Sequence, residues 1–190
     1  MTVQSAPNHW IDALTPERAS VLVQVFAISF FAVATALGAQ VRIYLWEIPI
    51  TLQTLFVYGS GLMLGARNAS ISMLLYLFMG LFFPVYAGSG HGLTYLTTAV
   101  SAGYLFGMPL SAYVIGHFGS RKQTLSGSII AVIAGSLVLF TCGVAWLHYA
   151  AAHTSWWYSI EVGWLRFIGF DAAKVLLISL TYGSLRRWGQ

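Results

Sequence analysis

Long apolar runs separated by short polar stretches dominate the chain. They cover residues 20–40, 50–65, 69–85, 99–118, 125–151 and 163–185. A helix rises about 1.5 Å per residue, so about 17–20 apolar residues cross the hydrocarbon core of a bilayer. The pattern therefore predicts an all-α integral membrane protein with six transmembrane helices. These helices would form a single membrane domain over residues 1–190, with a polar tail at residues 1–19.

Composition supports a membrane environment for the whole chain. Hydrophobic residues make up 58% of it and charged residues only 7%, whereas a soluble domain carries about 25% charged residues. So few charges cannot cover a water-facing surface. The net charge of +4 includes two basic pairs, Arg121–Lys122 and Arg186–Arg187, and both flank apolar runs. This placement indicates membrane anchoring and argues against nucleic acid as a partner.

The basic residues also predict the orientation of the chain in the membrane. Six spans place both termini on one side, and that side carries Arg18, Arg67, Arg121, Lys122, Arg186 and Arg187. The opposite side carries only Arg42 and Arg166. Because cytoplasmic loops are enriched in Lys and Arg, the N and C termini are expected in the cytoplasm. The external loops are then residues 41–49, 86–98 and 152–162.

The last apolar run carries two opposite charges, Asp171 and Lys174. Each charge costs about 2.5–3.5 kcal/mol at the centre of a bilayer on translocon scales. Residues three apart share one face of a helix, so both side chains are expected to point into protein. An ion pair that fixes helix packing would explain them, although a buried pair is often no more stable than apolar residues. A carboxylate and an ammonium on one face also suit a small solute with N–H and C=O groups.

The ends of the first two external loops supply further candidate contacts for such a solute. The candidates are Gln40, Gln53, Thr54, Tyr86 and Gly88, with Tyr44 and Trp46 nearby. Glycines let backbone approach a ligand closely, and Gly88, Gly90 and Gly92 follow Tyr86 within a few residues. Such glycine-rich stretches are also typical of plain turns.

Ordered motifs along the chain resemble those of the BioY family. From about Ala36 to Lys174 these include "ALGAQV", "IPITLQTL", "LGARNASISMLLYL", "FPVYAGSG", "AGYLFG" and "DAAK". The resemblance implies a six-helix bundle in the bacterial inner membrane. It further implies biotin uptake, as the biotin-binding S component of an energy-coupling-factor (ECF) transporter that takes its ligand from the external side. The acid and amine of "DAAK", Asp171 and Lys174, are implied as ligand contacts.

Biotin suits the chemistry of these side chains. Its ureido ring carries two N–H donors and one carbonyl acceptor, so we expect Asp171 to accept from an N–H and Lys174 to donate to the carbonyl. Pairing of Lys174 with the valerate carboxylate is an open alternative. Tyr86, Trp46 and Tyr104 would cover the apolar thiophane ring and tail.

No motif in the chain indicates an enzyme. Neither lysine, Lys122 or Lys174, follows a glycine, so the chain lacks the Gly-Lys-Ser/Thr of an ATP-hydrolysing P-loop. No metal and no cofactor is expected, since His148 and His153 are five residues apart and do not share a helix face.

The partners expected besides biotin and membrane lipid come from the resemblance. It implies a separate ECF coupling protein and ATPase subunits, with the Ala32 and Ala36 spacing as a candidate docking face. The same spacing also packs helices within one chain. Two other functions stay open: an ion-coupled secondary transporter with Asp171 and Lys174 as a proton relay, and a membrane scaffold that binds no solute. A homo-oligomer is also an open alternative.

Overall fold

The structure is a computed structural model that describes residues 19–44, 48–119 and 124–187. Residues 1–18 of the expected tail, Trp46 and the pair Arg121–Lys122 lie outside the described residues. The elements are α1 (Val21–Gln40), β1 (Arg42–Ile43), β2 (Ile50–Thr51), α2 (Gln53–Phe82), η2 (Ala87–Ser89), α3 (Gly92–Thr98), α4 (Ala102–Gly119), α5 (Leu125–Ala150), α6 (Trp156–Gly163), η3 (Leu165–Phe167) and α7 (Ile168–Arg187).

The chain reverses direction inside α2, at Gly65. This residue has φ 73° and ψ 173°, a conformation that glycine adopts at little cost. Gln53 and Tyr76 are 23 residues apart, and a continuous helix would separate them by about 34 Å. Instead, Nε2 of Gln53 donates to Oη of Tyr76 at 2.7 Å. The two halves of α2 therefore pack side by side, and the reversal lies at the polar stretch "GARNA" between two predicted spans.

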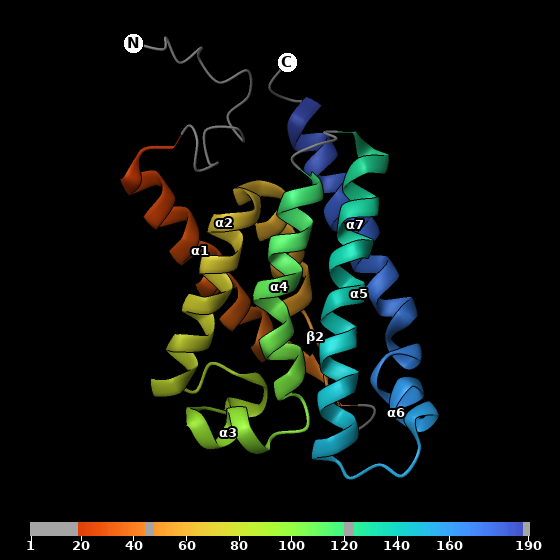
Figure 1. The fold of residues 1–190 in the computed structure, drawn as a ribbon. Helices are drawn as coiled ribbons and strands as arrows, with labels where there is room; N and C mark the ends of the chain where they lie inside the picture. Colours follow the sequence, from red (N-terminus) through yellow and green to blue (C-terminus); the bar gives the residue numbers. More distant parts are fainter. Residues whose placement is uncertain (1–18, 45–47, 120–123, 188–190) are drawn as a thin grey trace.

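Long helical segments run side by side along one bundle axis (Figure 1). They are α1, the two halves of α2, α4, α5 and α7. By length and composition Val21–Gln40, Gln53–Ser89 (which includes both halves of α2) and Leu125–Ala150 are apolar enough to cross a membrane, and α3 with α4 forms a bent pair that passes the same test together. The prediction of an all-α multi-pass membrane protein is confirmed. The beginning of α1 and the end of α7 lie at the same end of the bundle (Figure 1), and the cytoplasmic location of this end stays a prediction.

The opposite end of the bundle carries short elements that the sequence did not predict. Strands β1 and β2 form a small antiparallel hairpin in which Arg42 pairs with Thr51 and Ile43 with Ile50. Helices α3 and α6 lie at this same end (Figure 1), within stretches expected to be loops. At seven and eight residues they are too short to show a helical apolar period that stands out from the neighbouring spans.

Helix α1 packs closely against α2 through small residues. Ala32 has no exposed surface and Ala36 is 8% exposed. Nearby, Ser72 Oγ of α2 donates to the Ile28 carbonyl of α1 at 2.7 Å, so the two helices are also hydrogen-bonded. The Ala32 and Ala36 face is thus occupied within the chain, which is the packing role that the same spacing also allowed. A partner could reach these two side chains only after α1 moved away from α2.

Candidate functional site

A cavity opens between the helices at the end of the bundle that carries the β1–β2 hairpin and α3. Its empty volume is about 650 Å³, a figure that includes open space at its mouth. The lining residues are Ile48, Pro49, Ile50, Thr51, Gln53, Thr54, Ala87, Tyr95, Ser101, Tyr104, Leu105, Met108, Leu139, Phe140, Phe167, Phe170, Asp171 and Lys174. Helices α2, α3, α4, α5 and α7 all contribute to this list.

Lys174 reaches from α7 to the beginning of α2. Its Nζ donates to the Thr51 carbonyl at 2.7 Å and to Thr54 Oγ1 at 2.9 Å. An ammonium has three N–H donors, so one donor remains beyond these two bonds. Because Lys174 lines the cavity, this remaining donor is the one available to a ligand.

Asp171 is held by hydroxyl groups from two other helices. Tyr58 of α2 donates to Oδ1 at 2.6 Å, and Ser136 of α5 donates to Oδ2 at 2.5 Å. Within the described residues no ion pair joins Asp171 to Lys174, although they share one face of α7. The interpretation of these two residues as a mutual ion pair is therefore not supported. A carboxylate has about four lone-pair sites, so Asp171 can still accept a hydrogen bond from a ligand.

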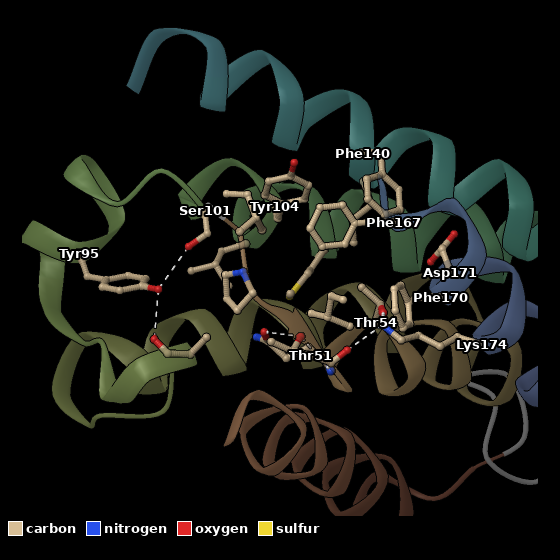
Figure 2. A pocket seen from close by; sticks show the side chains of 18 residues that line it. Thr51, Thr54, Tyr95, Ser101, Tyr104, Phe140, Phe167, Phe170, Asp171 and Lys174 are labelled. Carbon is tan, nitrogen blue, oxygen red and sulfur yellow. Dashed lines mark hydrogen bonds between the residues drawn. The ribbon is translucent and has the colours of Figure 1, made fainter. Parts of the chain in front are cut away.

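The cavity has two polar ends joined by an aromatic wall (Figure 2). Asp171 and Lys174 lie at one end, and Tyr95 and Ser101 lie at the other. Phe140 and Phe167 lie between them (Figure 2). Such a shape suits an elongated ligand that has a polar group at each end and an apolar body.

Tyr104 forms part of this wall and also ties two elements together. Its hydroxyl donates to the Gly163 carbonyl, at the C-terminal end of α6, at 2.6 Å. The ring is packed on Gly143 so closely that a Cβ added there would lie 2.2 Å from Tyr104 Cδ1. Tyr104 thus links α4 to the segment that leads into α7.

Gln53 lines the cavity with both ends of its amide engaged. Oε1 accepts from Thr51 Oγ1 at 3.0 Å, and Nε2 donates to Tyr76 at 2.7 Å. The amide nitrogen retains a second N–H. The structure therefore brings five predicted residues to the cavity: Asp171, Lys174, Gln53, Thr54 and Tyr104.

Three other predicted contacts lie away from the cavity lining and hold the surrounding loops. Gln40 bonds to the Tyr86 carbonyl at 3.4 Å and accepts from Arg42 at 2.9 Å. Tyr86 is fully buried, and its hydroxyl donates to the Leu77 carbonyl at 2.7 Å. Gly88 adopts φ 75° in η2, where a Cβ would lie 2.8 Å from the Tyr44 hydroxyl.

Several lining residues were missed by the sequence analysis. Phe167 precedes Asp171 by four residues, about one helical turn. The helix-face reasoning that placed Asp171 and Lys174 together could therefore have included it. Phe140, Tyr95 and Thr51 carry no local signal, because each resembles an ordinary packing or loop residue. Only the long-range fold brings them to the cavity.

The fold and cavity define a multi-pass helical membrane protein with a solute-sized site at one end of its bundle. Comparison with known proteins gives the family directly: residues 12–190 match the model of the BioY family. The chain belongs to the BioY family.

Curated relatives agree over most of their length. The probable biotin transporter BioY of Lysinibacillus sphaericus is 36% identical over 161 residues, covering 80% of this chain and 81% of that protein. The biotin transporter BioY of Rhizobium etli is 32% identical over 163 residues, covering 80% and 86%. That of Thermotoga maritima is 29% identical over 158 residues, covering 83% and 92%.

A solved structure has the same fold. The S component for biotin from an ECF-type ABC transporter superposes with a TM-score of 0.79 at 23% identity. The match covers 87% of this chain and 92% of that one. This likeness supports the arrangement of the helices described above.

Proposed function

We propose that this chain is the biotin-binding S component of an ECF-type transporter and that it takes up biotin from the external side. The observation that carries the proposal is the placement of Asp171 and Lys174 at one end of an otherwise largely aromatic and aliphatic cavity. Membership of the BioY family supports it, as do relatives named biotin transporters.

The chemistry of the polar end suits the ureido ring. Asp171 would accept a hydrogen bond from a ureido N–H, and the free donor of Lys174 would reach the ureido carbonyl. The aromatic side chains between the two ends, Phe140 and Phe167 among them, would cover the thiophane ring and tail.

The valerate carboxylate belongs, in this proposal, at the opposite end. At the Lys174 end it would lie near the like charge of Asp171, which is unfavourable in a site with little water. Tyr95 and Ser101 offer neutral hydroxyls at the far end, 3.2 Å from each other. Either hydroxyl could turn its proton toward a carboxylate.

Gln40, Tyr86 and Gly88 would support this site indirectly. Their contacts hold the hairpin and η2 at the mouth of the cavity. We propose that substitutions here act through loop position, whereas Gln53, Thr54 and Tyr104 contact the ligand or its immediate partners.

ATP-driven transport would require proteins beyond this chain, since its sequence contains no ATP-hydrolysing P-loop motif. We propose a coupling protein and ATPase subunits on the cytoplasmic side of the bacterial inner membrane. The excess of basic residues at the end with both termini supports that orientation. Because Ala32 and Ala36 are buried, docking at that face would require α1 to separate from α2.

Calorimetry of the detergent-purified protein with biotin tests the proposal. We expect tight binding by the natural sequence and a large loss of affinity in Asp171→Asn and Lys174→Ala, with both variants still folded. Absence of biotin binding, or unchanged affinity in both variants, would contradict it. Uptake by cells that collapses with an uncoupler but persists without ATP would favour the ion-coupled alternative.

A further inference from the structure

We propose that Tyr58 and Ser136 are positioning residues of the ligand site, which clamp the Asp171 carboxylate so that its remaining lone pairs face the cavity. This inference rests on the proposed function. Neither residue belongs to the cavity lining, so each would act on the ligand only through Asp171.

The clamp joins three helices at one carboxylate. Tyr58 lies on α2, Ser136 on α5 and Asp171 on α7, so the donors are 113 and 35 residues away from the acid. Each carboxylate oxygen receives one hydroxyl, at 2.6 Å from Tyr58 and 2.5 Å from Ser136. Distances this short are typical of hydrogen bonds to an ionised acceptor.

Both donors are shielded from solvent. Tyr58 has no exposed surface and Ser136 is 6% exposed, so solvent does not replace the bond. A serine within a helix commonly donates to the carbonyl four residues earlier. The hydroxyl of Ser136 donates instead to Asp171 on another helix.

The clamp has a consequence for ligand selection. One bond on each oxygen fixes the plane of the carboxylate and removes its freedom to rotate. An ionised carboxylate held in this way is an acceptor only, so it selects a ligand that presents N–H groups. A ligand group with acceptors alone, such as a second carboxylate, would leave its lone pairs facing those of Asp171.

Single-atom substitutions separate this role from helix packing. Tyr58→Phe and Ser136→Ala each remove one hydroxyl, and we expect biotin affinity to fall about tenfold in each. Matched controls are Tyr182→Phe and Ser128→Ala, which remove buried hydroxyls from α7 and α5 away from Asp171. We expect these controls to change affinity less than about twofold.

Two further measurements report on positioning specifically. In an Asp171→Asn background, adding Tyr58→Phe should change affinity less than about twofold, because the residue acts through the acid. Biotin methylated at either ureido nitrogen provides the second readout. The natural sequence should discriminate against the methylated ligand whose N–H faces Asp171, and Tyr58→Phe should reduce that discrimination about tenfold.

Ser136→Thr guards against loss of folding, because it keeps a hydroxyl and should retain affinity within about threefold. The inference is overturned if the hydroxyl-deleted proteins unfold at lower temperature yet bind biotin and its methylated forms as the natural sequence does. That result would leave a helix-packing role alone. Failure of the natural sequence to bind biotin would instead overturn the proposed function together with this inference.

Discussion

Helices α1 and α7 are both 20 residues long, yet they attach to the bundle in different ways. The buried residues of α1 are mostly small: Ala27, Phe31, Ala32, Ala34, Thr35, Ala36, Gly38 and Ala39. Those of α7 are only Val175, Ser179 and Tyr182. Helix α7 is instead tied to α2 and α5 by the hydrogen bonds of Asp171 and Lys174.

In this bundle, different helices contribute mainly to stability and mainly to ligand binding. In lipid, helices associate through close packing and interhelical hydrogen bonds, because lipid tails are as apolar as the side chains. The close packing of α1 depends on side-chain volume, so a change there is expected to alter stability without altering ligand affinity. Asp171 and Lys174, which hold α7 in place, also line the cavity, so a ligand and the neighbouring helices share the same donors and acceptors.

Lys174→Met should produce the largest loss of biotin affinity. It removes the free donor while keeping a long unbranched side chain, and truncating a buried charged contact costs about 2–5 kcal/mol. We expect biotin affinity to fall about 100-fold or more, measured by calorimetry on monodisperse protein. The matched control is Arg186→Met, which removes a cation at the other end of α7 and should leave affinity unchanged. Equal losses in both would show that net charge, and not the cavity contact, determines binding.

Ala32→Leu tests the α1 side of the comparison. Ala32 has no exposed surface, so the added carbons must displace neighbours at a cost of about 1–3 kcal/mol. Thermal unfolding in detergent should shift down, while the folded fraction binds biotin with unchanged affinity. Val33→Leu, at a position 45% exposed on the outer face of α1, is the control and should change little. A large loss of affinity in Ala32→Leu would show that the packing of α1 also determines ligand binding.

Gly143→Ala tests whether the position of the Tyr104 ring in the aromatic wall matters for binding. The new methyl would lie 2.2 Å from Tyr104, so the ring must move toward the cavity and weaken its bond to Gly163. We expect affinity to fall about tenfold, a cost typical of an overpacked site. Gly183→Ala adds the same methyl on α7 at 3.8 Å from Leu125, an ordinary contact, and should be neutral. If both bind biotin equally well, Tyr104 does not shape the site.

Thr54→Val should give the smallest of the expected losses of biotin affinity. It removes one of the two acceptors that hold Lys174 and leaves the Thr51 carbonyl in place. Loss of such a bond is worth about 1 kcal/mol, so we expect affinity to fall about fivefold. Thr181→Val on the exposed side of α7 is the matched control. An effect as large as that of Lys174→Met would mean that Thr54 contacts the ligand itself.

Sequence patterns predicted the parts of this molecule that depend on local chemistry. Charges in an apolar run marked Asp171 and Lys174, and a polar stretch in another marked the reversal at Gly65. The partners of Asp171 gave no such signal. Tyr58 and Ser136 resemble ordinary residues of apolar helices, and only the packing of α2 and α5 against α7 brings them together. Tyr86 was predicted at the ligand as a loop aromatic, and in the structure its ring is buried and is not part of the cavity lining.

A structure of the protein with biotin bound would show whether Asp171 and Lys174 hold the ureido ring. We expect the ureido ring between Asp171 and Lys174, with its carbonyl at hydrogen-bond distance from Nζ of Lys174 and an N–H directed at Asp171. The valerate carboxylate should lie at the Tyr95 and Ser101 end. Biotin bound outside this cavity, or bound with no contact to either charged side chain, would contradict it.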